Sequence, residues 1–172
     1  MESHFAPMHF ESNYQCNKGV AILARAFTSS QSTHFAGADL ATSEVDPDDT
    51  AEREYQRYQY QLLTAEIEHE GESFRVNTTH LPVTIEGQVT WFQLEAIENL
   101  LSLMKTQPEC ILCGDTNAPR GRDAFAKLAE HYTDNIPATY TTSIDGALHR
   151  AGDIPFMVDG LFTTPGYRTE NV

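Results

Sequence analysis

The 172-residue chain has few cysteines, few basic residues and no long apolar run. Three cysteines, an odd number, do not suggest a disulfide framework and favour a reducing, cytoplasmic location. Only 11 Lys and Arg stand against 25 Asp and Glu, and the net charge of −14 argues against a broad nucleic-acid-binding face. We expect neither a membrane span nor a signal peptide, because no apolar stretch is long enough and no basic-then-apolar leader is present.

The composition otherwise predicts a folded domain. Hydrophobic residues make up 40% of the chain, which is typical of a globular protein. A chain of this length can bury one core, so we expect a single domain over residues 1–172. The acidic balance does not exclude a phosphate substrate, because bound divalent cations would supply local positive charge.

Short apolar runs and alternating patterns predict strands. We expect residues 1–17 to form a loop, the acidic residues 43–54 to form a solvated loop, and residues 70–72 to form the turn of an antiparallel hairpin. The expected strands are residues 18–25, an edge strand within 26–40, and 60–68, 75–80, 111–113 and 156–162.

Two helices are expected. The longer one covers residues 84–105, with Thr84 as its N-cap and Gln93 mostly off its apolar face. Its apolar stripe consists of Val89, Phe92, Ala96, Leu100, Leu103 and Met104. The shorter helix covers residues 123–131, and its inward residues are Phe125, Leu128 and Ala129.

Cys110 and Cys113 have the spacing of a zinc-binding or redox pair. On a strand, however, residues three apart face opposite sides, so these two thiols would not share a metal. We interpret both as small apolar core residues.

The same strand carries the main candidate site. The apolar run ends at Gly114 and leads to Asp115 and Asn117, which would project together from the strand end because residues two apart share a face. A carboxylate beside an amide suits a hard cation and a phosphate oxygen. The alternative is an Asx turn that closes the strand, which Gly, Asp and Asn also favour.

Two further strands carry one polar group each. The strand at 75–80 ends at His80, and the apolar run 156–162 contains Asp159. An aspartate inside an apolar strand is costly to bury unless it is paired or functional. We therefore group His80 and Asp159 with the candidate site.

In this order, the motifs Asn-Thr-Thr-His-Leu, Gly-Asp-Thr-Asn and Val-Asp-Gly-Leu-Phe resemble those of the endonuclease/exonuclease/phosphatase superfamily, the DNase I-like fold. The resemblance extends over about residues 19–167. It implies an α+β fold, a four-layer αββα sandwich, of which this chain would be a part. It also implies a metal-dependent phosphoesterase that hydrolyses a phosphoester substrate with an activated water and one or two Mg²⁺ or Mn²⁺ ions.

The resemblance assigns a role to each polar residue. Asp115 resembles the carboxylate that binds the metal and positions the attacking water, and Asn117 resembles its partner that holds a phosphate oxygen. His80 resembles the histidine that contacts the scissile phosphate or the leaving oxygen. Asp159 resembles the aspartate that orients a catalytic histidine.

Two arginines, Arg120 and Arg150, are weaker candidates for binding the substrate phosphate, since guanidinium groups suit phosphate. For both, a surface salt bridge is the alternative interpretation.

The chain also departs from the family pattern. No apolar strand ending in a metal-binding Glu precedes residue 19, since Glu2 and Glu11 have the wrong surroundings, and no Ser-Asp-His strand follows Asp159. We therefore expect a fragment that lacks the N-terminal strands and the C-terminal strand. Such a fragment would expose strand edges, be marginally stable and have little activity alone.

Two other hypotheses remain open. One is a non-catalytic, degenerate member of the same fold that acts as a binding module. The other is an acidic α+β binding domain with no tie to the family. The substrate stays undefined, because this scaffold serves DNA, phosphoinositides, sphingomyelin and nucleotides and the fold does not determine the function. The acidic balance slightly disfavours duplex DNA.

Overall fold

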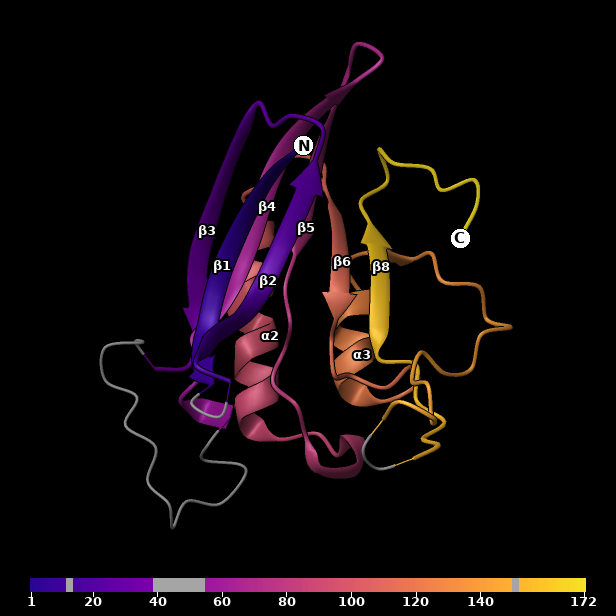
Figure 1. Cartoon of the computed structure of the whole chain (residues 1–172). Coiled ribbons are helices and arrows are strands. Elements are labelled where there is room, and N and C mark those ends of the chain that lie inside the picture. Colours follow the sequence, from indigo (N-terminus) through magenta and orange to yellow (C-terminus); the bar gives the residue numbers. More distant parts are fainter. Residues whose placement is uncertain (12–13, 39–54, 150–151) are drawn as a thin grey trace.

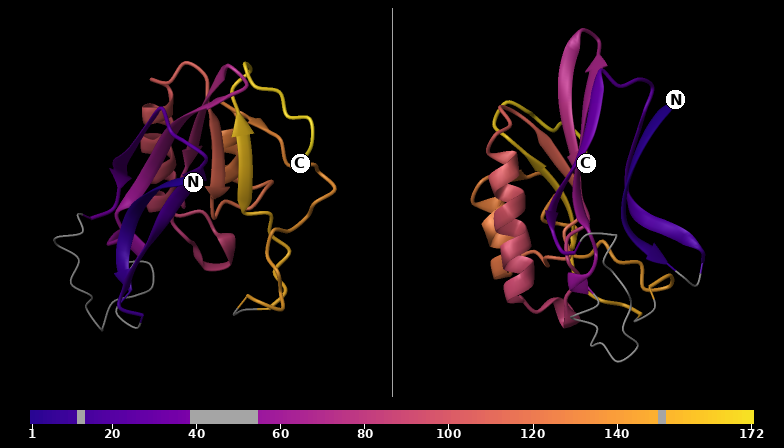
Figure 2. Two further views of the ribbon diagram at one scale, coloured as in Figure 1. Left: turned by 45° about the horizontal axis from the view of Figure 1, so that its top comes forward. Right: turned by 90° about the vertical axis from the view of Figure 1, so that its left-hand side faces the viewer.

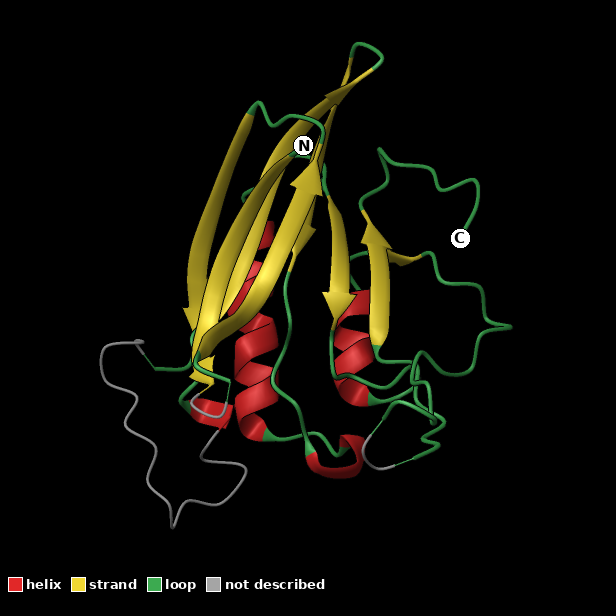
Figure 3. Ribbon diagram, viewed as in Figure 1, coloured by secondary structure: helices red, strands yellow, loops and turns green. Residues whose placement is uncertain are grey.

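The computed structural model describes residues 1–11, 14–38, 55–149 and 152–172. Within them, the strands form a two-stranded sheet and a six-stranded sheet (Figures 1 and 3). The strands are β1 (Glu2–Glu11), β2 (Cys16–Ala24), β3 (Ser29–Ala36), β4 (Tyr60–His69), β5 (Glu72–Thr78), β6 (Ile111–Asp115), β7 (Thr133–Asp134) and β8 (Asp159–Thr163). The helices are the short 3₁₀ turn η2 (Ile85–Gly87), α2 (Trp91–Met104) and α3 (Asp123–Ala129).

The six-stranded sheet has the order β3-β4-β5-β6-β8-β7. Only β5 and β6 pair in parallel, and α2 lies in the crossover between them, as a parallel connection requires. The other pairs are antiparallel. The predicted edge strand is β3, and the predicted hairpin is β4–β5, whose turn residues Glu70 and Gly71 have φ of 53° and 86°, typical of a tight hairpin turn.

The elements form three layers (Figure 2, right). Helices α2 and α3 cover one face of the six-stranded sheet. The β1–β2 hairpin lies over β4 and β5 on the other face. Of the expected αββα layers, the described residues therefore provide one helix layer and two sheet layers. Within these residues, no helix is both long and apolar enough to cross a membrane.

The prediction of a loop at residues 1–17 is wrong, because β1 occupies most of that segment. Ala6 and Met8 of β1 are buried together with Val20 and Ile22 of β2. The register of β1 shifts between Pro7 and His9, which breaks the simple alternation that predicts a strand.

The prediction that the long helix starts after Thr84 is also wrong. Glu86 and Gly87 have φ of 52° and 64°, so the chain turns before the helix. The N-cap is Thr90, whose side-chain oxygen accepts a hydrogen bond from the backbone N–H of Gln93 at 3.2 Å. The buried residues of α2 are Phe92, Gln93, Ala96, Ile97, Leu100, Leu101 and Met104.

Smaller differences concern the other segments. Ala129 is exposed, and Ala124 packs inward with Phe125 and Leu128. The last strand begins at Asp159, so the first residues of the predicted run 156–162 precede it. The predicted acidic loop at 43–54 lies outside the described residues.

Candidate functional site

The ends of β5 and β6 and the start of β8 meet at one end of the sheet, the lower end in Figure 1. Parallel pairing of β5 with β6 brings their C-terminal ends together. Antiparallel pairing of β6 with β8 places Asp115 directly opposite Asp159. The backbone N–H of Leu81 donates to the carbonyl oxygen of Asp115 at 2.9 Å, which holds the segment after β5 against the end of β6.

A glycine is required where these strands approach each other. Gly114 has a φ of 148°, and a Cβ placed on it would lie 2.1 Å from the backbone oxygen of Thr79. Any side chain would push apart β6 and the segment that carries His80. The glycine in the Gly-Asp-Thr-Asn motif therefore allows the close approach of the two predicted site residues, His80 and Asp115.

His80 and Asp115 form the centre of the site. His80 Nε2 lies 3.7 Å from Asp115 Oδ2, and their side chains are 50% and 34% exposed. Burial raises the pKa of Asp115, whereas His80 and the N–H of Asn117 lower it and the charge of Asp159 adds to the increase. A carboxylate with a raised pKa is a better proton acceptor than an ordinary surface aspartate.

The prediction that Asp115 and Asn117 project from one face of a strand is wrong, because β6 ends at Asp115 and Asn117, with a φ of 46°, lies in the turn after it. The backbone N–H of Asn117 donates to Asp115 Oδ1 at 2.9 Å, which is the Asx turn proposed as the alternative. Asn117 has a φ of 46°, and its side-chain Nδ2 donates to the carbonyl oxygen of Leu81 at 2.8 Å. Asn117 thus joins the segment after β6 to the segment after β5. Its second side-chain N–H and its side-chain oxygen can bind other partners.

Asp159 lies at the exposed start of β8. The hydroxyl oxygen of Ser143 accepts hydrogen bonds from the backbone N–H groups of Val158 and Asp159, each at 3.1 Å. In the antiparallel pairing of β6 with β8, Asp159 lies opposite Asp115. The predicted role of Asp159 in orienting a histidine stays a prediction.

Of the two arginines predicted to bind the substrate phosphate, the structure describes only Arg120. Arg120 Nη2 pairs with Asp134 Oδ2 at 2.8 Å and donates to the carbonyl oxygen of Ile136 at 2.9 Å. This pairing confirms the salt-bridge interpretation for Arg120. Arg150 lies outside the described residues.

Gln93 is a supporting residue that the sequence interpretation missed. It is fully buried in α2, and its side-chain Nε2 donates to the carbonyl oxygens of Pro82 at 3.1 Å and Asn117 at 2.8 Å. It therefore fixes the loops after β5 and β6 to the helix. The signal was present in the spacing, because Gln93, Ile97, Leu100 and Met104 repeat at helical intervals.

Cys110 and Cys113 contribute to packing. Cys110 is buried, and the Sγ of Cys113 lies 3.6 Å from the backbone oxygen of Asn77. Burial raises the pKa of both thiols, which lowers the fraction of reactive thiolate at neutral pH.

The described residues contain no group of three or more His, Cys, Asp or Glu side chains that could hold a metal ion. They do place two carboxylates, Asp115 and Asp159, opposite each other at the strand ends. Mg²⁺ is commonly bound by one or two carboxylates, with water and substrate phosphate as the remaining ligands. The oxygen donors of Asp115 and Asp159 fit that kind of binding.

No family model matches the sequence, and no curated protein sequence matches it. Several solved structures do. The chain is similar to SmcL, with a TM-score of 0.63 and 14% identity over 96% of this chain and 62% of that chain. It is also similar to an endonuclease/exonuclease/phosphatase family protein from Bacteroides thetaiotaomicron, with a TM-score of 0.59 and 12% identity over 95% and 61% of the two chains. The human Nocturnin catalytic domain with bound sulfate gives a TM-score of 0.55 and 13% identity over 95% and 60%.

The fold and the convergent strand ends define a mixed-sheet domain with polar side chains at one end. It has the fold of the endonuclease/exonuclease/phosphatase proteins, so the resemblance predicted from the three ordered motifs is confirmed at the level of the fold. The chain spans about three fifths of the length of these structures.

Proposed function

We propose that the chain carries part of the catalytic site of a metal-dependent phosphoesterase, which hydrolyses a phosphodiester or phosphomonoester with an activated water. The observation that supports it best is the convergence of His80, Asp115 and Asp159 from three separate segments, in the order that the family motifs predict. The neighbours with this fold include a protein of the endonuclease/exonuclease/phosphatase family and a catalytic domain that binds sulfate, a phosphate-like anion.

Each residue has a role in this reaction. Asp115 holds the attacking water in line with the phosphorus atom and accepts a proton from it. His80, half exposed beside it, donates a hydrogen bond to a phosphate oxygen or to the leaving oxygen. Asn117 positions Asp115 through the Asx turn and offers its remaining side-chain N–H to the phosphate. Mg²⁺ or Mn²⁺, when bound by Asp115 and Asp159, would stabilise the charge that develops on the phosphoryl oxygens.

The test is a hydrolysis assay with bis(p-nitrophenyl) phosphate and p-nitrophenyl phosphate, with and without Mg²⁺ or Mn²⁺. We expect slow, metal-dependent release of p-nitrophenol that falls about 100-fold or more in Asp115→Asn, because the general base is lost. The matched control is Asp123→Asn, which changes a carboxylate on α3 outside the site. Equal turnover in Asp115→Asn and in the unchanged protein would contradict the proposal.

The second candidate is a phosphate-binding module without turnover. The observation that favours it is the use of Asp115 Oδ1 and Asn117 Nδ2 in structural hydrogen bonds within the turn. Binding of the p-nitrophenyl esters without any metal-dependent hydrolysis would support this candidate over the first.

A further inference from the structure

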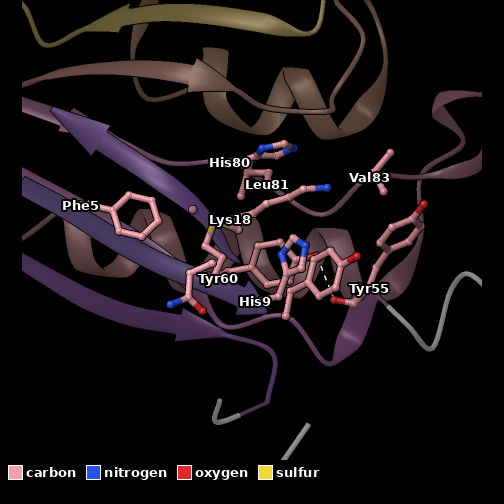
Figure 4. Close-up of a pocket in the computed structure, with 12 residues that line it drawn as sticks. Phe5, His9, Lys18, Tyr55, Tyr60, His80, Leu81 and Val83 are labelled. Carbon is pink, nitrogen blue, oxygen red and sulfur yellow. Dashed lines mark hydrogen bonds between the residues drawn. The ribbon is translucent and has the colours of Figure 1, made fainter. Parts of the chain in front are cut away.

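A cavity of about 400 Å³ opens beside the candidate site, between the β1–β2 hairpin, the start of β4 and the segment after β5. Figure 4 shows its side chains, which come from these separate parts of the chain. We call it the tyrosine pocket and define it by its tyrosine and basic or imidazole lining residues: His9, Lys18, Tyr55, Tyr58, Tyr60 and His80. Its volume lies within the range of roughly 300–1,000 Å³ that is usual for small-molecule sites.

Flat aromatic surfaces form one wall of the pocket. The rings of His9 and Tyr58 stack with their centroids 3.9 Å apart and an angle of 5° between their planes. The ring of Tyr55 meets Tyr58 edge-on, with a centroid distance of 5.8 Å. Together these rings give the pocket a planar, aromatic wall against which another planar ring can pack.

This wall is held in place by hydrogen bonds. The hydroxyl of Tyr60 donates to the backbone oxygen of Tyr55 at 2.9 Å. The backbone N–H of Gln59 donates to the carbonyl oxygen of Met8 at 2.7 Å, which joins the segment before β4 to β1. Ordering the wall in advance lowers the entropy cost of binding a ligand.

The charge of the pocket differs from that of the whole chain. The chain has a net charge of −14, yet the described lining residues contain no carboxylate and include Lys18 and two histidines. The amine of Lys18 pairs with Glu11, which does not line the pocket, at 2.9 Å. Because the described lining has no carboxylate to repel an anion and has N–H donors on Lys18 and the histidines, it can accept a ligand that combines a planar ring with a negative charge.

His80 connects the pocket to the candidate site, because it lines the pocket and lies 3.7 Å from Asp115. We propose that the tyrosine pocket binds a planar aromatic group of the substrate while the attached phosphate lies at His80 and Asp115. The substrate class is therefore a phosphoester of an aromatic-ring compound, such as a nucleotide. The placement of the phosphate rests on the proposed function, whereas binding of the ring in the pocket does not.

The test compares two probes that share a sugar phosphate and differ in the aromatic ring: adenosine 5′-monophosphate and ribose 5-phosphate. Titration calorimetry on the whole chain gives both affinities without any need for hydrolysis. We expect adenosine 5′-monophosphate to bind about tenfold more tightly, which is the lower range for stacking of one base. Equal affinities for the two probes would overturn the proposal.

Substitutions of Tyr58 test whether its ring causes the preference for adenosine 5′-monophosphate. Tyr58→Ala should remove the preference for adenosine 5′-monophosphate and leave the affinity for ribose 5-phosphate unchanged, whereas Tyr58→Phe should keep the preference. If Tyr58→Ala does not fold, as judged by circular dichroism, Tyr58→Leu replaces it because leucine fills the space without an aromatic face. The matched control is Trp91→Ala, since Trp91 is 64% exposed and does not line the pocket. A preference that survives loss of the Tyr58 ring would also overturn the proposal.

The two proposals fail in different ways. Suppose that the preference for the aromatic probe depends on Tyr58 but the nitrophenyl esters are not hydrolysed with metal. This result would support ring binding in the tyrosine pocket and contradict the proposed phosphoesterase activity. The opposite result is hydrolysis that depends on Asp115 without a preference for adenosine 5′-monophosphate. It would support the phosphoesterase activity and contradict ring binding in the tyrosine pocket.

Discussion

The two faces of the six-stranded sheet are covered by different kinds of layer, helices on one and a β-hairpin on the other. On the helix face, Ala96, Ile97 and Leu100 have no exposed surface. On the other face, the β1–β2 hairpin lies over β4 and β5 and buries Ala6 and Ile22. The alternate residues Phe5 and Leu23 of the hairpin are 46% and 63% exposed, because no further layer of the described residues covers them. The helix face thus supplies close packing that holds the strand ends in register, while the hairpin face leaves the tyrosine pocket open beside them.

The largest expected effect comes from a cavity on the helix face. Leu100→Ala removes a fully buried side chain and should lower the free energy of unfolding by about 2–5 kcal/mol, measured by urea denaturation. The matched change on the hairpin face, Leu23→Ala, removes an exposed side chain and should change the stability by no more than about 0.5 kcal/mol. Similar losses in both variants would contradict the difference in burial between Leu100 and Leu23.

The next effect tests the close approach of the strands at the site. Gly114→Ala places a Cβ against the backbone oxygen of Thr79 and strains a left-handed φ, so we expect a loss of about 1–3 kcal/mol and lower hydrolysis. The control is Gly71→Ala, which also has a positive φ but no atom within 4 Å of its new Cβ. If both variants lose equal stability and neither loses activity, the close approach does not position His80.

A smaller effect tests the link from the helix face to the site. Gln93→Leu leaves the carbonyl oxygens of Pro82 and Asn117 without their shared donor, which should cost about 1–2 kcal/mol in chemical denaturation. The control is Glu95→Leu, an exposed position on the same helix. A variant Gln93→Leu as stable and as active as the unchanged protein would show that α2 does not fix the site loops.

The smallest effect is a change in the pH dependence of stability. Burial raises the pKa of Asp115 above that of an ordinary aspartate, so the folded protein holds the carboxyl proton more tightly than the unfolded chain does. Stability should therefore fall as the pH rises through the raised pKa, where the buried carboxylate becomes charged.

Asp115→Asn has no carboxyl group and stays neutral at every pH in this range. It should be more stable than the unchanged protein near pH 7, and the difference should vanish below the ordinary range of an aspartate. Thermal unfolding between pH 3 and pH 7, in buffer with EDTA, measures this. Parallel curves for the two proteins would show that Asp115 carries no cost from burial.

Local patterns in the sequence predicted the elements whose signals lie within a few residues. The hairpin β4–β5, the strand β6 and the helix α3 follow from alternation, from a turn with glycine and from a short apolar run. The three ordered motifs that contain His80, Asp115 and Asp159 were enough to predict the family fold. Strand β1 was missed because Pro7 and a register shift interrupt its alternation.

Only the tertiary structure decided how the polar groups of the site are used. The pairing of β6 with both β5 and β8 brings His80, Asp115 and Asp159 to one end of the sheet. The direction of the Asn117 side chain depends on a carbonyl 36 residues earlier, in Leu81, and the role of Gln93 depends on two loops. The sequence by itself determined which residue types stand at the strand ends, because that choice is local. Their distances, burial and hydrogen-bond partners are set by long-range packing.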